Sequence, residues 1–350
     1  MLFPDGLRGI AAMLVILPHA VGLLAYWSAP SAFTRMIIQA APFGSCGVQI
    51  FFVLSGFVIA YTLRNAKFSP RYVGNFILRR SIRLDPPYWT AIVIYLGFIT
   101  LRHHMGHEPL LYPSAAKLLA HLFYAQDVLG YGDINVVFWT LCIEIQFYVV
   151  FVVLLWSVQA LWRTGSRRAP FVGLFVLSLA WPAGLLSHGF YAGSFLPHWY
   201  GFLAGAVIWW TVGGESPYWA GYSAIAALGL IAAATQDAAP LMVGVAAGAL
   251  LLSSYRGNLY RWLRQRPFQL LGRLSYCIYL IHVPIGMILL GALVRVAPSH
   301  EIVSYLFIAA LVLVTIGFAY AMHQLVEVPA LRWARYLKPS ITQPTSSRRA

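Results

Sequence analysis

Leu7-Arg-Gly-Ile-Ala-Ala-Met-Leu-Val-Ile-Leu-Pro-His19 opens this chain with an apolar run that has a charge at its start and an imidazole inside. Arg8 and His19 are eleven residues apart, almost three turns of a 3.6-residue helix, so their side chains share one face. By helical rise His19 lies about 16 Å beyond Arg8, near the middle of a hydrocarbon layer of about 30 Å. An ionisable group at this depth is costly unless it faces a bundle interior or a wet cavity. His19 is therefore either a functional residue or a buried histidine bonded to a neighbouring carbonyl.

Composition places the whole chain in a membrane. The 350 residues are 60% hydrophobic and only 10% charged, and their mean hydropathy is +0.72. A soluble fold of this size cannot bury so much apolar surface, so we expect an all-α, polytopic integral membrane helix bundle. The three cysteines, Cys46, Cys142 and Cys277, lie in apolar segments without paired spacing, and we predict neither a disulfide framework nor a metal site.

Basic and Pro/Gly-rich breaks divide the apolar sequence into about ten transmembrane helices. We expect them near residues 8–27, 46–64, 84–101, 136–160, 171–187, 196–212, 218–235, 239–254, 273–294 and 302–325. If the N-terminus is cytoplasmic, 20 of the 24 lysines and arginines fall on the cytoplasmic side. We therefore predict that both termini are cytoplasmic, with residues 1–338 as the transmembrane domain and residues 339–350 as a disordered tail.

The net charge of +14 follows from this topology. Basic residues on the inner face are retained by the positive-inside rule and attract the anionic lipids of the bilayer, so the charge does not indicate nucleic-acid binding. One basic cluster is denser than the rule requires. Arg79, Arg80 and Arg83 precede a Pro-Pro pair at which we expect the third span to begin, and on a helix two of the three project together. We favour a phosphate-binding site in this cytoplasmic segment over simple topological charge.

Two further spans place polar side chains at mid-depth. Ser55 lies about 13 Å into the second span, where a Ser-Gly pair usually serves close helix packing. Glu144 lies about 12 Å into the fourth span, close to the depth of His19, so a helix contact would pair the two. A carboxylate on one imidazole nitrogen strengthens the other as a base, although a structural clasp between helices is the alternative. In the ninth span Tyr279 and His282 are candidates to line the same cavity.

The order of these motifs resembles acyltransferase family 3, the membrane-bound acyltransferases that O-acylate cell-envelope glycans and some secondary metabolites. The resemblance extends from Asp5 to Pro329. It rests on Leu7-Arg-Gly9 with His19, Phe51-Phe-Val-Leu-Ser-Gly-Phe57, Arg79-Arg-x-x-Arg83, Trp139-Thr-Leu-x-x-Glu-x-Gln-Phe-Tyr148, Leu274-Ser-Tyr-x-x-Tyr-Leu-x-His282 and Glu327-x-Pro329. Each motif is weak alone, but six in this order are specific.

The resemblance implies transfer of an acyl group, usually acetyl, from cytoplasmic acyl-coenzyme A (acyl-CoA) to a hydroxyl at or beyond the outer leaflet. It makes Arg8 and His19 the first-helix motif and Glu144 the fourth-helix carboxylate, three candidate catalytic residues. It assigns Arg79, Arg80 and Arg83 to donor binding, whereas Ser55, Tyr279 and His282 remain candidates for the cavity lining. The family's usual Ser and second Glu of the fourth-helix motif are Thr140 and Ile145 here, which leaves Glu144 as the single acid.

The chemistry agrees with this interpretation. A sugar hydroxyl is a poor nucleophile at neutral pH, so its attack on a thioester needs a general base, which His19 supported by Glu144 would supply. Whether His19 deprotonates the acceptor or first accepts the acyl group stays open. The expected acceptors are a glycan, a lipid-linked sugar or a secondary metabolite, and the expected location is a bacterial cytoplasmic (inner) membrane. The rival interpretation is a transporter or flippase of envelope precursors in which His19 and Glu144 relay protons.

Overall fold

The computed structural model of this protein describes residues 1–24, 27, 30–104, 112–161, 168–187, 193–296 and 300–336. Within these ranges the chain is helical and contains no strand, which confirms the all-α prediction. The helices are α1 (Leu2–Leu24), α2 (Ala32–Ala40), η1 (Ala41–Ser45), α3 (Cys46–Leu63), α4 (Pro70–His104), α5 (Ala115–Leu122), α6 (Trp139–Leu161), α7 (Ala169–Ser178), η3 (Leu196–His198), α8 (Trp199–Val212), α9 (Tyr218–Thr235), α10 (Ala238–Ser254), η4 (Tyr255–Tyr260), α11 (Arg266–Val296), α12 (Ile302–Met322), η5 (His323–Glu327) and α13 (Val328–Tyr336). The predicted tail, residues 339–350, lies outside the described residues.

Every one of the ten expected spans contains a helix, and eight helical segments of the described chain are long and apolar enough to cross a membrane. The two expected spans near 171–187 and 196–212 are shorter than predicted, because α7 has 10 residues and α8 has 14. At about 21 Å, α8 falls short of the hydrocarbon thickness. Its residues from Trp199 to Thr211 are all buried, so its apolar sequence reflects burial within the bundle instead of contact with lipid.

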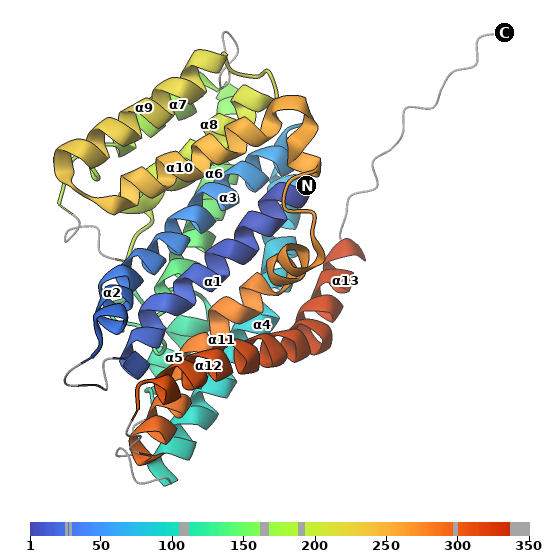
Figure 1. Ribbon diagram of the computed structural model, residues 1–350. Coiled ribbons are helices and arrows are strands. Elements are labelled where there is room, and N and C mark those ends of the chain that lie inside the picture. The colour runs from blue at the N-terminus through green and yellow to red at the C-terminus, as the bar shows by residue number, and fades with distance from the viewer. Residues whose placement is uncertain are drawn as a thin grey trace.

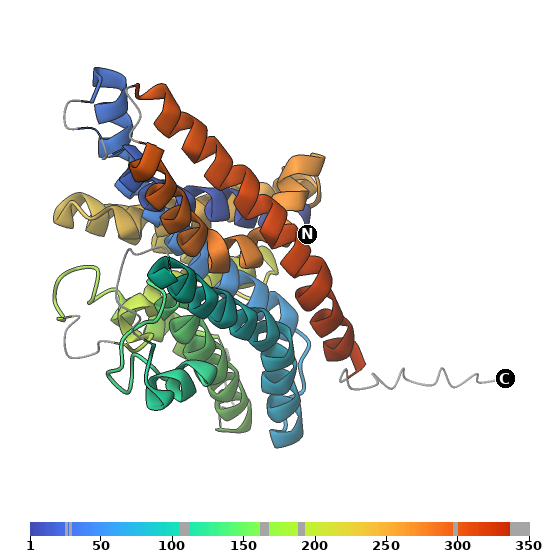
Figure 2. The same ribbon diagram turned by 90° about the horizontal axis from the view of Figure 1, so that it is seen from below.

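Helix α1 lies between α3 and α11, and these three helices form the centre of the bundle (Figure 1). Helices α9 and α10 pack side by side at one edge. At the other edge α12 continues through the π-helical turn η5 into α13, so that residues 302–336 form one continuous helical segment (Figure 2). Two apolar clusters fill the interior, one mainly around α3, α6 and α8 and the other mainly around α1, α4 and α11.

Glycines set the closest helix contact, between α3 and α8. A Cβ atom on Gly56 would lie 1.7 Å from the carbonyl oxygen of Phe202, and one on Gly205 would lie 1.9 Å from that of Val53. No side chain fits at either position, as expected for small residues at membrane helix contacts. Ser55 precedes Gly56 and points about 100° away from it around the helix. The Ser-Gly pair thus combines the predicted packing role with a hydroxyl that faces elsewhere.

Candidate active site

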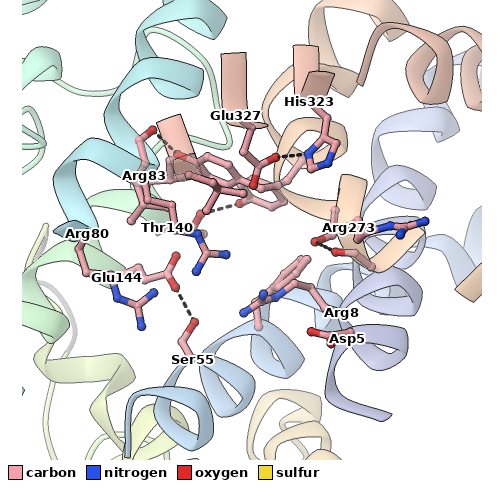
Figure 3. A pocket seen from close by; sticks show the side chains of 18 of the residues that line it. Asp5, Arg8, Ser55, Arg80, Arg83, Thr140, Glu144, Arg273, His323 and Glu327 are labelled. Atoms are coloured by element: carbon pink, nitrogen blue, oxygen red, sulfur yellow. Dashed lines mark hydrogen bonds and ion pairs between the residues drawn. The ribbon is translucent and has the colours of Figure 1, made fainter. Parts of the chain in front are cut away.

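A cavity of about 520 Å³ lies between α1, α3, α4, α6, α11 and the turn from η5 into α13 (Figure 3). Six arginines line it, namely Arg8, Arg80, Arg83, Arg273, Arg332 and Arg335. Three acidic side chains, Asp5, Glu144 and Glu327, offset only part of this charge. A cavity with one dominant sign of charge concentrates ligands of the opposite sign. Its chemistry therefore suits a polyanion.

Glu144 lies on the α6 wall of this cavity and is held by two hydroxyl groups. Ser55 Oγ donates a hydrogen bond of 2.5 Å to Glu144 Oε1, and the hydroxyl of Tyr148 donates to the same oxygen (Figure 3). Tyr148 is one helical turn beyond Glu144, and the guanidinium of Arg80 lies 4.5 Å from the centre of its ring. An arginine over a tyrosine ring is a favourable cation–π arrangement. The carboxylate thus belongs to a network with Ser55, Tyr148 and Arg80.

The arginine cluster lies inside α4 and not in a loop before it. Our prediction that the third span begins at the Pro-Pro pair was wrong, because α4 runs without a break from Pro70 to His104 through Pro86 and Pro87. A proline inside a helix removes a backbone hydrogen bond and normally bends or ends it. Here side chains hold the turn together. Ser81 Oγ donates a hydrogen bond of 2.5 Å to Asp85 Oδ2, and the Tyr124 hydroxyl donates one of 3.1 Å to Asp85 Oδ1.

The three arginines of the cluster point in different directions. Arg80 and Arg83, at i and i+3, line the cavity. Arg79 does not line it, and its Nε donates 3.2 Å to the carbonyl oxygen of Asn75 on the preceding turn. Arg83 Nε is buried without a hydrogen-bond partner among the described residues. A buried donor without a partner is costly, so this guanidinium is prepared to bind an acceptor that enters the cavity.

At the rim beside α13, three side chains meet within 4.8 Å of one another, Cys277, His323 and Glu327. Glu327 Oε2 accepts from His323 Nδ1 at 2.8 Å and from Cys277 Sγ at 3.4 Å. These groups have the chemistry of metal ligands. They already satisfy one another, however, and the arginines of the same cavity repel a cation, so the arrangement favours a hydrogen-bonded clasp between α11 and η5. Glu327, the acid of the Glu-x-Pro motif, is thus paired with His323.

The deep end of the cavity is formed by Thr140 and Tyr279, whose hydroxyl oxygens are 2.6 Å apart. Beyond this layer the ring of His282 lies 6.0 Å from the Tyr279 ring, between centroids, and the ring of His19 lies 5.0 Å from that of His282. His282 is buried and His19 is half-buried. A chain of rings therefore leads from the cavity through Tyr279 and His282 to His19.

An ordered segment covers the neighbouring end of the bundle. His121 Nε2 accepts 2.9 Å from the backbone N–H of Ile134, so its Nδ1 donates 2.7 Å to the carbonyl of Lys117. Asn135 Nδ2 donates 3.4 Å to the carbonyl of Leu280 on α11. Burial raises the pKa of Asp133 to about 6, so this carboxyl group takes up a proton in mild acid. The His121 bonds tie the 115–138 segment to itself, and the Asn135 bond holds it against α11, the helix that carries Tyr279 and His282.

Residues 1–323 match the sequence model of the acyltransferase domain of acyltransferase family 3. The chain belongs to acyltransferase family 3. The match includes every cavity wall except the one formed by the turn from η5 into α13, because Glu327 and the lining residues of α13 follow residue 323. Neither the curated proteins nor the solved structures contain a significant match. As in the sequence, the family's fourth-helix motif retains one acid, and the structure gives that acid Ser55 and Tyr148 as partners.

One predicted contact of this family 3 protein is not formed. The sequence paired His19 with Glu144 because their depths in the membrane agree, but no hydrogen bond joins these two described residues. Glu144 bonds to Ser55 and Tyr148, whereas His19 packs against His282. The depth of a residue along the membrane normal does not determine which helix lies beside it. Helix α1 packs mainly on α11 and α3 and not on α6. The lateral neighbour of His19 is therefore a residue of α11.

The other predicted site residues divide between two places. Arg8, Ser55, Arg80, Arg83, Glu144 and Tyr279 line the cavity, while Arg79, His19 and His282 do not. Four further lining residues were not among the predicted site residues, namely Tyr148, Arg273, Arg332 and Arg335. The spacing of Tyr148, one turn after Glu144, was a usable signal. The sequence held no such signal for the three arginines, because the positive-inside rule alone accounts for arginine in their segments.

Proposed function

We propose that this protein is an acyl-CoA-dependent O-acyltransferase of a bacterial cytoplasmic membrane that acylates a hydroxyl of an extracytoplasmic glycan, lipid-linked sugar or secondary metabolite. One observation carries the proposal, the arginine-lined cavity that extends to hydroxyl groups at mid-depth. Coenzyme A has a pyrophosphate and a 3′-phosphate at one end and a thioester at the end of a narrow, uncharged arm. The cavity offers the complementary order, with guanidinium groups toward its rim and Thr140 and Tyr279 at its end.

The orientation of the cavity supports a cytoplasmic donor. Its lining uses the first third of α1, the first half of α11 and α13. The count of lysines and arginines assigns this end of the bundle to the cytoplasm. Bidentate arginine contacts suit phosphate groups. The acetyl group, which the family usually transfers, needs little further space. Acetyl-CoA is therefore the proposed donor.

In the proposed reaction, the acceptor hydroxyl attacks the carbonyl carbon of the thioester. His19 takes the hydroxyl proton, a new ester C–O bond forms, and the C–S bond breaks to release coenzyme A, which recovers the proton as its thiol. His19 lies beyond Tyr279, on the far side of the cavity from the arginines, so acceptor and donor approach from opposite ends. Glu144 acts on the donor side, where it orients Tyr148 and Arg80.

The test uses everted membrane vesicles from cells that produce the protein, because these vesicles expose the cytoplasmic face to added substrate. We expect label from [acetyl-¹⁴C]acetyl-CoA to appear in the glycan or lipid fraction as an ester that mild alkali releases. Vesicles with His19→Ala and vesicles without the protein are the controls. A protein that binds or moves labelled donor while all label stays on coenzyme A would contradict the proposal and favour the transporter.

A further inference from the structure

Helices α1 and α11 pack in parallel and in register along the interface that carries both mid-depth histidines. A Cβ atom on Gly9 would lie 2.7 Å from the backbone nitrogen of Gly272, so the two helices touch there. Ten residues further along each helix, from 9 to 19 and from 272 to 282, the rings of His19 and His282 meet at 5.0 Å. Nearer the outer end, Gly22 faces Leu290. The histidine pair is thus a fixed feature of this interface.

A proline interrupts the backbone hydrogen bonds of the helix near each of the two histidines. Pro18 precedes His19 in α1, and Pro284 follows His282 in α11. Since proline has no N–H, Pro284 leaves the carbonyl of Leu280 without its helical donor, and Asn135 Nδ2 donates to that carbonyl instead. The turn around His282 is therefore held in place from a second segment of the chain.

The protonation of His282 follows from its backbone contacts. Its Nδ1 lies 2.9 Å from the carbonyl oxygen of Tyr279 and 3.2 Å from that of Ile278, and carbonyl oxygens only accept. Nδ1 therefore carries the hydrogen, and in the neutral ring Nε2 is an acceptor. His282 Nε2 is buried and has no hydrogen-bond partner among the described residues. An acceptor in this state is costly unless a donor reaches it.

His19 is the side chain placed to supply that donor. At the observed separation, ring nitrogens that turn toward one another come within hydrogen-bond distance. A second polar group near His282, the Tyr279 hydroxyl, already contacts Thr140 and the carbonyl of Val137. We propose that His282 is the positioning residue of His19: its Nε2 accepts the N–H of the His19 ring and so leaves the second nitrogen of His19 free to take the acceptor proton. This inference rests on the proposed function, and it gives His282 the role that the sequence assigned to Glu144.

Two substitutions separate positioning from packing. In His282→Asn the amide can still donate to the backbone carbonyls as Nδ1 does, but nothing replaces Nε2. In His282→Gln an amide oxygen reaches the place of Nε2. We expect His282→Asn to lower kcat by about 10- to 100-fold, as for other residues that orient a reacting group, with KM for acetyl-CoA unchanged. His282→Gln should recover a large part of the loss. His104→Gln, at an exposed position on α4, is the matched control.

A second measurement does not depend on activity. Long-range ¹H–¹⁵N spectra of protein with labelled histidines should show His282 in the Nδ1–H form, and the ring signals of His19 should shift in His282→Asn but not in His282→Gln. Full kcat in His282→Asn, or equal losses in both folded variants with an unshifted His19 ring, would overturn the inference. If the wild type binds acetyl-CoA but transfers nothing, the proposed function fails while the spectra still decide the histidine pair.

Discussion

The arginine-lined cavity contains Glu144 and the α1–α11 interface contains His19, and the surroundings of these two ionisable groups differ. Around Glu144 the walls are charged and hydroxylated, and the Nε atom of Arg83 has no hydrogen-bond partner within the described part of the chain. Beside His19 the neighbouring titratable ring belongs to His282, and ten residues earlier the same two helices touch at Gly9 and Gly272. Binding a polyanion needs space and fixed charge, whereas proton transfer needs a rigid, nearly dry contact. Under the proposed function, donor binding and proton transfer therefore belong to two separate regions that meet at Tyr279.

The sharpest way to break this division is a double substitution. If Glu144 acts on the donor side and His282 on His19, the losses in Glu144→Gln and His282→Asn should multiply, because no described residue is hydrogen-bonded to both. We expect about 10-fold from removing the Glu144 charge beside Arg80 and about 10- to 100-fold from His282→Asn, hence a combined loss of about 100- to 1,000-fold. Transfer rates at saturating acetyl-CoA measure this directly. If the double variant transfers acetyl no more slowly than the slower single variant, Glu144 and His282 act together and Glu144 belongs to the His19 site.

The donor side itself is tested by the split of the arginine cluster. Replacing Arg80 and Arg83 by alanine removes two charge-assisted contacts, each worth about 1.5–3 kcal/mol, so the Kd for acetyl-CoA should rise by at least about 100-fold. Arg79→Ala is the matched control, since Arg79 bonds back to Asn75 and does not line the cavity. Isothermal titration with purified protein gives the affinities. Equal losses in Arg79→Ala and in the double variant would mean that only the overall charge of α4 matters.

Gly9→Ala examines the rigidity of the α1–α11 interface. The added Cβ would lie 2.7 Å from the backbone of Gly272, and overpacking of this kind costs about 1–3 kcal/mol. We expect a lower melting temperature in detergent. Gly74→Ala on α4 is the control, because a Cβ there meets nothing within 4 Å and the substitution should stabilise the helix by up to about 1 kcal/mol. Equal melting temperatures for the two variants would show that the interface shifts to accommodate the added methyl group and is not rigid.

The smallest expected effect concerns α13, which lies beyond the residues that match the family. Arg332 and Arg335 are exposed at the rim of the cavity, where a contact to phosphate contributes up to about 1 kcal/mol each. Their replacement by alanine should raise the Kd for acetyl-CoA by a few-fold at low salt. The Kd for acetyl-dephospho-CoA, which lacks the 3′-phosphate, should not change. Arg261→Ala with Arg264→Ala removes the same charge outside the cavity. If both pairs weaken both ligands alike, α13 provides only general surface charge.

Much of this arrangement followed from the sequence. Composition and spacing identified the membrane bundle, and Arg8, Arg80, Glu144 and Tyr279 do meet in one cavity. Periodicity could not supply the partner of His19, because helical rise fixes depth but leaves the neighbouring helix open. Nor could it show that α4 continues through two prolines, since the side chains that hold this turn include Tyr124, from a segment far along the chain. Both misses concern contacts between segments.

His19 is proposed to take the acceptor proton while the arginine-lined cavity holds the donor, so the decisive measurement compares binding and transfer in His19→Ala. The variant should enter the membrane at the normal level and bind acetyl-CoA with unchanged affinity in isothermal titration. In everted vesicles its transfer of label to alkali-labile ester should fall by about 100- to 10,000-fold, the usual contribution of a general base. A folded His19→Ala protein that binds acetyl-CoA and transfers acetyl at the wild-type rate would contradict the account.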